Sequence, residues 1–429
     1  MLHAKFPIRM PENHCVFDIK AAIESGKFDQ AIHIFLEYSI HPDRKSLFLL
    51  LKACAKLRSI ERGRAIHAES VKHGMERDLI LGTILVDMYA KCGFLVDAQE
   101  IFDELAVHDV VSWTALISGY AENGLNEETL KCLVRMQAEN ISPNCVTYIC
   151  TLKGCGNLEE IDMGYGLHAE IIKEGFEKEL FIGSTLVDMY AKCGFLKEAQ
   201  EIFEELTLRN IVTWNALIAG YSQHRRGFET LKCFEQMQSE GFLPDAVTFT
   251  CILKACGSVG LLQKGEYIHA GIHKRGSLQN NVLLGNALVD MYVKCGVLPK
   301  AQEAFNDLPM HDVATWNALI AGYAQHALGN KAVDCFTQMQ GEGMLPDAIT
   351  FTCVVKACGG IGSLVKGEEV HAEIRRRGLL KTNMLLGSAL ISMYGKCGAI
   401  FKALEVFHEL PERNVVSWTA LIAAYAQNG

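Results

Sequence analysis

One eight-residue stretch recurs four times in this chain at a nearly constant interval. It reads W-T-A-L-I-S-G-Y from Trp113, and near-copies begin at Trp214, Trp316 and Trp418. These are the only tryptophans of the sequence, and they lie 101, 102 and 102 residues apart. A fixed period of this kind is typical of proteins in which successive supersecondary units stack on one another. The chain is therefore expected to fold as a stack of repeats.

Each copy of this stretch has the pattern of an α-helix. In the copy from Trp214, the residues Leu217, Ile218 and Tyr221 follow at i+3, i+4 and i+7, which gives one apolar face. A hydroxyl residue precedes every tryptophan and can accept a hydrogen bond from a free N–H group of the first turn. We therefore predict that a helix begins at each of these residues, which are Ser112, Thr213, Thr315 and Ser417.

Length and composition agree with an elongated stack. With 429 residues, of which 49% are apolar, the chain far exceeds a usual single-core domain. Only 9 prolines occur, and no low-complexity run suggests a linker between domains. No apolar run reaches the roughly 18 residues that a membrane-spanning helix needs.

The charge and the cysteines constrain partners and compartment. A net charge of −9 argues mildly against a nucleic-acid partner, although it says little about any single groove. Sixteen cysteines could suggest a disulfide framework, but they recur at repeat positions and form no C-x-x-C. Small buried thiols in a reducing compartment are the preferred interpretation.

Alignment of the copies divides the chain into units that each carry the pattern of two helices. Residues 1–11 are interpreted as a leader or truncated transit segment, in which Lys5 and Arg9 occur and no acid precedes Glu12. The units are then 12–43, 44–78 and 79–109, the three triplets 110–210, 211–312 and 313–414, and a partial unit 415–429. Because half a unit leaves an apolar face uncovered, the protein is expected to continue beyond residue 429.

Three motifs alternate through these units: V-V-S-W-T-A-L-I-S-G-Y, then L-K-A-C-G, then L-V-D-M-Y-A-K-C-G. In type, length and order they resemble the P, L and S repeats of pentatricopeptide repeat proteins of the plant P-L-S subclass, over residues 15–429. The resemblance implies an all-α, right-handed superhelical α-solenoid of about 12 helix-turn-helix repeats, without a C-terminal deaminase domain in this chain. In these terms 44–78 is an L repeat, 79–109 is an S repeat, and 415–429 is a partial P repeat.

The resemblance further implies sequence-specific binding of single-stranded RNA, with one base per repeat and the strand running 5′ to 3′ as the chain runs from N to C. In the family the fifth and the last residue of each repeat face the RNA. Asn offers a donor and an acceptor to a pyrimidine edge, whereas Ser or Thr leaves room for a purine. The pairs are Thr83/Asp109, Thr114/Asn144, Ser184/Asn210, Asn215/Asp245, Asn286/Asp312, Asn317/Asp347 and Ser388/Asn414. The alternative is that they are helix caps and turn residues, which favour the same residue types.

The family's preferences turn these pairs into an expected target. Thr/Asp prefers G, Thr or Ser with Asn prefers A, and Asn/Asp prefers U, so the chain from residue 79 reads 5′-GAnAUnUUnA-3′. Each n marks an L repeat, to which no base is assigned because its fifth residue departs from the pattern. These fifth residues are Phe48, which precedes the stretch read here, Ile149, Thr250 and Thr352.

Lysines recur at the thirteenth place of the S repeats, on the first helix. They are Lys91, Lys192, Lys294 and Lys396. They are candidate phosphate contacts, and solvated surface lysines are an equally good interpretation.

No constellation for catalysis, metal or cofactor binding is found. H-A-E recurs at His67, His168 and His371 and matches the H-x-E half of a zinc deaminase. All three are copies of one repeat position, Gly271 replaces the glutamate after His269, and no P-C-x-x-C follows. We interpret these histidines as structural and expect a binding protein, not an enzyme.

By resemblance the chain is expected to recognise an RNA editing site in a plant mitochondrion or chloroplast and to recruit an editing deaminase, supplied in trans or by a missing C-terminal region. Two alternatives remain open at this point. One is an organellar factor that stabilises or processes transcripts, and the other is a protein-binding scaffold like a tetratricopeptide repeat protein. Salt-dependent binding to a short single strand separates the scaffold from the RNA-binding readings.

Overall fold

A computed structural model gives the fold of this protein. It describes residues 21–22, 25, 27–38, 44–72, 74–75, 78–274 and 281–429. Within these ranges every regular element is an α-helix, apart from the short 3-10 helix η1 (Leu379–Lys381). No helix in the described part is long and apolar enough to cross a membrane. The predicted all-α repeat solenoid is confirmed, while the predicted leader, residues 1–11, lies outside the described residues.

The chain divides into two compact units, residues 1–217 and 218–429, and helix α13 (Ile211–Gln223) contains the boundary. The helices of the first unit are α2 (Phe28–Tyr38), α3 (Arg44–Leu57), α4 (Ile60–Lys72), α5 (Leu79–Lys91), α6 (Leu95–Asp103), α7 (Val110–Glu122), α8 (Asn126–Ala138), α9 (Cys145–Leu158), α10 (Ile161–Glu174), α11 (Leu180–Lys192) and α12 (Leu196–Glu205). Those of the second unit are α14 (Gly227–Ser239), α15 (Ala246–Val259), α16 (Leu262–Lys274), α17 (Val282–Lys294), α18 (Leu298–Asn306), α19 (Val313–Gln325), α20 (Gly329–Gly341), α21 (Ala348–Gly360), α22 (Leu364–Arg376), α23 (Met384–Lys396), α24 (Ile400–Glu409) and α25 (Val415–Asn428).

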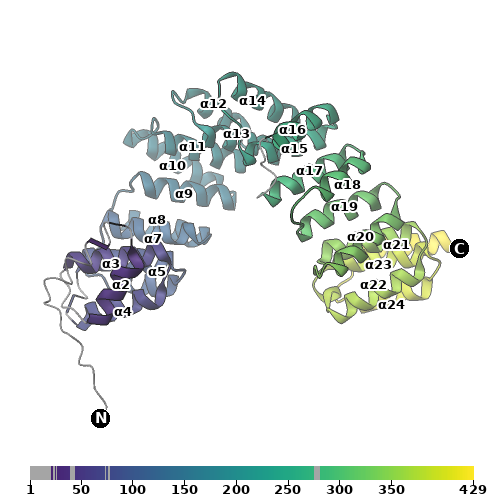
Figure 1. Cartoon of the computed structure of the whole chain (residues 1–429), viewed down its shortest axis with the longest axis horizontal. Coiled ribbons are helices and arrows are strands. Elements are labelled where there is room, and N and C mark those ends of the chain that lie inside the picture. The colour runs from purple at the N-terminus through teal and green to yellow at the C-terminus, as the bar shows by residue number, and fades with distance from the viewer. Residues whose placement is uncertain are drawn as a thin grey trace, which may run out of the picture. The chain divides into compact units, whose positions relative to one another are not determined.

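Within each unit the helices follow one another in pairs, and the first helix of each pair packs on the first helix of the next (Figure 1). In the first unit the helices α3, α5, α7, α9 and α11 are in contact in this order. In the second unit α15, α17, α19, α21, α23 and α25 are in contact in the same way. The second helix of each pair contacts its own first helix, as α6 contacts α5. Equivalent residues of successive first helices therefore lie along one side of each unit.

The first helices of the P repeats begin earlier than the hydroxyl residues predict. Helix α7 begins at Val110, and the residue that caps it is Asp109, whose carboxylate accepts from the backbone N–H of Ser112 at 2.8 Å. The predicted cap, Ser112, lies instead in the first turn, and its Oγ accepts from the N–H of Asp109 at 2.9 Å. Ser112 and Asp109 thus form a capping box, in which two free N–H groups are satisfied reciprocally. The prediction placed the start of this helix too late because Ser112 is the third residue of the helix and the partner of the cap, not the cap itself.

The repeated tryptophans fill the space between neighbouring repeats. Trp113 is fully buried and meets the ring of Phe102, from the second helix of the preceding repeat, edge to face at 4.6 Å. Phe305 and Trp316 repeat this contact at the same distance. Such aromatic pairs contribute about 0.5–1.5 kcal/mol beyond their buried area. The recurring tryptophans therefore stabilise the same packing of a P repeat on the repeat before it.

The first helices of neighbouring S and P repeats approach closely, and one of the two facing residues is always glycine in the described contacts. A Cβ added to Gly119 would lie 2.4 Å from the Cβ of Ala90, and a Cβ added to Gly322 would lie 2.7 Å from Val293. In the last such contact the sizes are exchanged, since the glycine is Gly395 in the S repeat and the alanine is Ala424 in the P repeat. In both arrangements one residue of the pair lacks a Cβ, which leaves room for the side chain of the other.

Candidate nucleic-acid interface

The predicted base-reading residues occupy two fixed places in each repeat. The fifth residues lie on the first helices, and they are Thr83, Thr114, Ser184, Asn215, Asn286, Asn317 and Ser388. The last residues each precede the next first helix and accept a hydrogen bond from its first turn, and they are Asp109, Asn144, Asn210, Asp245, Asp312, Asp347 and Asn414. Within a unit, the fifth residue of one first helix therefore lies beside the start of the first helix of the next repeat. Asn215 and Asp245 belong to different units.

In the two Asn/Asp repeats of the second unit, the fifth and last side chains are in direct contact. Asn317 Nδ2 donates to Asp347 Oδ1 at 3.1 Å, and Asn317 Oδ1 accepts from the hydroxyl of Thr350 at 2.6 Å. The same carboxylate accepts from the backbone N–H of Thr350 at 2.8 Å. Asn286 and Asp312 repeat the amide contact at 3.2 Å. The residue that caps the first helix of one repeat thus fixes the orientation of an amide on the first helix of the preceding repeat.

This contact leaves a defined set of hydrogen-bonding groups on the asparagine. An Asn amide has two N–H donors and an oxygen with two lone pairs. In Asn317 one donor is directed to Asp347 and one lone pair to Thr350. One donor and one lone pair remain, which is the combination that the edge of a pyrimidine base requires.

The carboxylates of these pairs are held in the charged state. Burial raises the pKa of Asp347, but hydrogen bonds from Thr350, from Asn317 and from the Ile349 backbone outweigh burial, so the pKa lies below its ordinary value. Asp312 has a lowered pKa for the same reasons. Because a carboxylate is acceptor-only when ionised, each aspartate orients its asparagine through the N–H side.

The hydroxyl pairs are arranged differently. Thr114 Oγ1 donates to the carbonyl of Val110 in its own helix and accepts from Asn144 Nδ2 at 3.0 Å. Ser184 contacts the hydroxyl of Thr213 at 2.7 Å, and Thr213 also contacts Asn210. A hydroxyl whose proton is committed to its own backbone offers only lone pairs outward.

The helix-cap alternative accounts for one member of each pair. The last residues cap the following helices, so capping alone explains why Asp and Asn occur there. Capping does not explain the fifth residues, because Thr114, Asn286 and Asn317 lie inside helices. Each contacts the residue that caps the first helix of the next repeat. Base reading by these pairs stays a prediction.

Sequence reasoning missed a row of exposed apolar side chains at the second residue of the first helices. They are Ile80, Val111, Val146, Phe181, Val212, Val247, Leu283, Ile349, Leu385 and Val416, and all are about half exposed or more. In the first unit Ile80 and Val111 flank Thr83 and Thr114 in a pocket of about 450 Å³. An apolar residue that recurs outside the buried face of an amphipathic helix is the signal that could have identified them. Such side chains are suited to contact the flat faces of bases.

The predicted phosphate-contacting lysines lie at the ends of the first helices of the S repeats, and three of them form ion pairs one turn back. These pairs are Lys91–Asp87 at 2.8 Å, Lys192–Asp188 at 2.8 Å and Lys294–Asp290 at 2.7 Å. Lys396 makes no ion pair with any described residue. Their contact with phosphate stays a prediction.

A second set of lysines escaped the sequence interpretation. Lys52, Lys153, Lys254 and Lys356 occupy the ninth place of the first helices of the L repeats, and all four are exposed. They lie one turn after the fifth residues to which no base is assigned. Their recurrence in the L-K-A-C, L-K-G-C and V-K-A-C segments was the available signal.

The H-A-E histidines contact tyrosines of the next repeat. His168 Nδ1 lies 2.9 Å from the Tyr190 hydroxyl, and His371 Nδ1 lies 2.8 Å from that of Tyr394. His269, which lacks the glutamate, makes the same contact with Tyr292 at 2.9 Å. Among the described residues, no group of three His, Cys, Asp or Glu side chains could hold a metal ion. The glutamate of H-A-E is therefore not needed for the contact between histidine and tyrosine that these positions share.

The cysteines that the structure describes are free thiols, and several are fully buried. Burial raises the pKa of Cys54 to about 12 and that of Cys256 to about 11. Because the thiolate is the reactive form, these side chains are expected to be chemically inert in the folded protein.

Comparison with known proteins identifies the repeats. A model of the PPR repeat family matches residues 108–157, 209–258 and 311–360, and a model of the PPR repeat matches residues 83–110, 184–211, 349–379, 388–415 and 416–429. The chain belongs to the pentatricopeptide repeat family. The matched segments extend through both units.

Relatives from Arabidopsis thaliana align over nearly the whole chain. A chloroplastic pentatricopeptide repeat-containing protein is 35% identical over 98% of this chain and 69% of its own length. A mitochondrial one is 33% identical over 94% of this chain and 45% of its own length, and a second chloroplastic one is 33% identical over 96% and 51%. The chain therefore spans about two thirds of the first relative and about half of the others.

A solved structure shares the fold. The pentatricopeptide repeat protein PPR10, in complex with an 18-nt psaJ RNA element, superposes with a TM-score of 0.65 over 97% of this chain and 77% of that one. The sequence identity is 17%, so this likeness shows the fold alone.

Proposed function

We propose that this pentatricopeptide repeat chain binds single-stranded RNA sequence-specifically, one base per repeat, with the strand running 5′ to 3′ from the N- to the C-terminal repeats. The observation that carries this proposal is the contact between Asn317 and Asp347, repeated by Asn286 and Asp312. It holds an amide at a fixed orientation with one donor and one acceptor left over. The complex of PPR10 with RNA supports the same kind of ligand.

The proposed target is 5′-GAnAUnUUnA-3′, read by the seven pairs from Thr83/Asp109 to Ser388/Asn414. The L repeats contribute no base preference to it. All ten bases have to be single-stranded, because a paired base cannot offer its Watson–Crick edge. The chain itself is proposed to be a binding protein and not an enzyme.

In the cell, we propose that the chain recognises an RNA editing site in an organelle and recruits a deaminase that acts in trans. The P-L-S order of the repeats and the chloroplastic and mitochondrial relatives support this role. A transcript-stabilising or processing factor would use the same interface, and differs only in what happens to the bound RNA.

The test is a titration of the purified chain with a ten-nucleotide RNA of the proposed sequence. Controls are a permuted RNA of equal composition and the same strand annealed to its complement. Tight, salt-dependent binding to the first RNA and weak binding to both controls are expected. Equal binding to the permuted RNA would exclude base reading, and failure to bind any RNA would favour a protein-binding scaffold.

A further inference from the structure

The ninth residue of the first helices follows a charge pattern that changes in the last triplet. The L repeats have lysine at this place, and the S repeats have aspartate at Asp87, Asp188 and Asp290. In the last S repeat the residue is Ser392, on α23. This single exchange removes one carboxylate from a recurring arrangement.

The missing carboxylate is the one that neutralises the lysine of the S repeats. Asp290 lies one turn before Lys294 and pairs with it at 2.7 Å, and the first two S repeats have the same pair. Ser392 lies one turn before Lys396 and cannot form an ion pair. Within the described ranges, neither Lys396 nor Lys356 of the preceding L repeat has an acidic partner.

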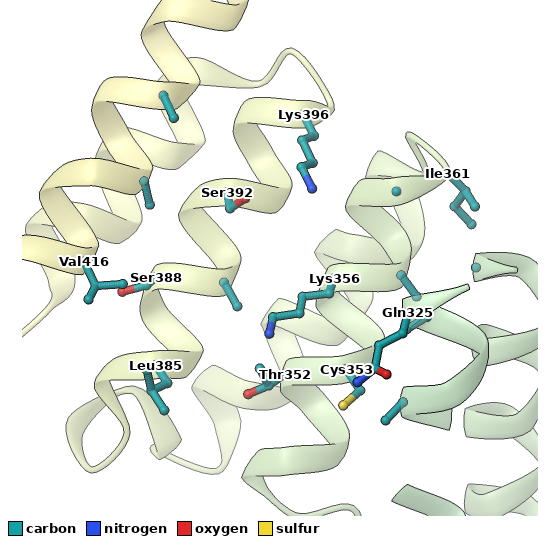
Figure 2. Close-up of a pocket in the computed structure, with 18 of the residues that line it drawn as sticks. Gln325, Thr352, Cys353, Lys356, Ile361, Leu385, Ser388, Ser392, Lys396 and Val416 are labelled. Carbon is teal, nitrogen blue, oxygen red and sulfur yellow. The ribbon is translucent and has the colours of Figure 1, made fainter. Parts of the chain in front are cut away.

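Lys356 and Lys396 line the same hollow, which has a volume of about 830 Å³ and lies within the second unit. Figure 2 shows both side chains extending into this hollow from neighbouring helices, with Ser388 and Ser392 on the same helix as Lys396. None of the residues that line the hollow is acidic. Two ammonium groups and no carboxylate therefore line one open space.

The corresponding hollow of the first unit contains carboxylates. It is lined by Lys52, the counterpart of Lys356, but also by Asp87 and Asp109. Asp87 pairs with Lys91 at 2.8 Å, so the lysine of this S repeat is neutralised. The exchange of aspartate for Ser392 thus distinguishes the last triplet from the first by one carboxylate.

We propose, on the basis of the RNA binding proposed above, that Lys356 and Lys396 form a site for a phosphodiester group of the RNA backbone. The ligand is an anion that accepts several hydrogen bonds, and the site supplies two ammonium groups with no internal carboxylate to displace. A lysine that is already paired with an aspartate loses that interaction when it binds phosphate, whereas Lys396 loses none. The last triplet therefore anchors the strand through its backbone, between the L repeat to which no base is assigned and the S repeat that contains Ser388.

The experiment exchanges the ninth residues of two S repeats. Ser392→Asp restores the ion pair of the other S repeats, and Asp290→Ser releases Lys294 in the reciprocal way. Ser392→Asn is the matched control, because it has the size of aspartate without its charge. Each variant is titrated with the proposed ten-nucleotide RNA and with the permuted RNA at several KCl concentrations, and circular dichroism melts verify that each variant is folded.

Ser392→Asp is expected to weaken binding to both RNAs about three- to tenfold at low salt and to flatten the dependence of log affinity on log salt by about 0.7, because one phosphate contact is lost. Asp290→Ser is expected to steepen that dependence by about 0.7, and Ser392→Asn to leave it unchanged. In a Lys396→Ala background, Ser392→Asp should have little further effect, which separates neutralisation of Lys396 from direct repulsion of the RNA.

The outcomes distinguish this site from the RNA binding on which it rests. If the original chain binds RNA and Ser392→Asp leaves the salt dependence unchanged, the phosphate site is wrong and the RNA binding stands. An equal loss with Ser392→Asn would assign the effect to size and also overturn the site. If the original chain binds no RNA at any salt concentration, both proposals are wrong.

Discussion

Asn317 Nδ2 donates a hydrogen bond to Asp347 Oδ1 at 3.1 Å, so the residue on one helix that is proposed to read a base is oriented by the cap of the next. The carboxylate has a structural role through its bond to the Thr350 N–H and a positioning role through its bond to the amide. Because one side chain has both roles, variants have to separate helix capping from base choice.

The first prediction changes the base preference of a single repeat. Asn317→Ser together with Asp347→Asn should shift preference from U to A at the eighth base and at no other. The matched and mismatched RNAs should differ by about 1–3 kcal/mol, by analogy with single mismatches in protein–DNA sites. Gel-shift titrations of both chains against both RNAs measure this difference.

Two controls accompany this exchange. Asn is as good a helix cap as Asp, so the unfolding midpoint should change little and a switch in base preference cannot be assigned to a lost cap. Asn286→Ser with Asp312→Asn should move the same change to the seventh base. Four equal affinities in the titrations would mean that these polar pairs only cap and pack.

The second prediction concerns the buried histidine of the last triplet. Burial lowers the pKa of His371 from its ordinary value of 6.5 to about 4. Between these values the unfolded chain binds more protons than the folded one, so stability is lost as the pH falls. At pH 5 the loss from this one residue should be about 2 kcal/mol.

Urea unfolding at pH 7 and pH 5 tests this loss. His371→Gln should reduce the difference in unfolding free energy between the two pH values by about 2 kcal/mol. The exposed His408→Gln is the control and should leave the difference as it is in the original chain. If His371→Gln leaves it unchanged too, folding does not lower the pKa of His371.

The third prediction uses the exchanged sizes at the contact between α23 and α25. Gly395→Ala should destabilise the second unit by about 1–3 kcal/mol. A Cβ at residue 395 would lie 2.4 Å from the Cβ and 2.9 Å from the Cα of Ala424, so the helix backbone itself would have to shift. Thermal melts followed by circular dichroism measure the effect.

Adding Ala424→Gly to that variant should recover most of the lost stability, because the pair then has the arrangement of Ala90 and Gly119. Gly271→Ala is the control for helix propensity. A Cβ there meets nothing within 4 Å, so this variant should gain about 0.5–1 kcal/mol. Additive effects of the two substitutions at 395 and 424 would show that the two residues do not share one space.

The fourth prediction concerns thiols and metal. Because burial raises the pKa of Cys256 and Cys358 to about 11, both should resist iodoacetamide in the folded protein and react after unfolding. Mass spectrometry of the labelled protein identifies the protected positions. Elemental analysis should find no stoichiometric zinc, and about one zinc per chain would contradict the structural interpretation of the H-A-E segments.

The sequence by itself determined the fold class, because a helix pair that recurs at a fixed interval can bury its apolar face only against its neighbours. The period of Trp113, Trp214, Trp316 and Trp418 and the apolar spacing within each copy were sufficient for this. Helix starts were less well determined, since a capping box contains two residues that both favour the start of a helix. Ser112 and Asp109 could be told apart only in the structure.

The candidate interface needed both sources. The sequence, through its resemblance to a family, designated the fifth and last residues, but these are about 30 residues apart in the chain. Only the packing of α19 on α21 brings Asn317 to Asp347 and leaves one donor and one acceptor on the amide. The position of Lys396 in the repeat did not by itself show that this lysine lacks an acidic partner. The sequence contains Ser392 where the other S repeats have aspartate, but only the structure shows which side chains from the neighbouring helix share the hollow with Lys396.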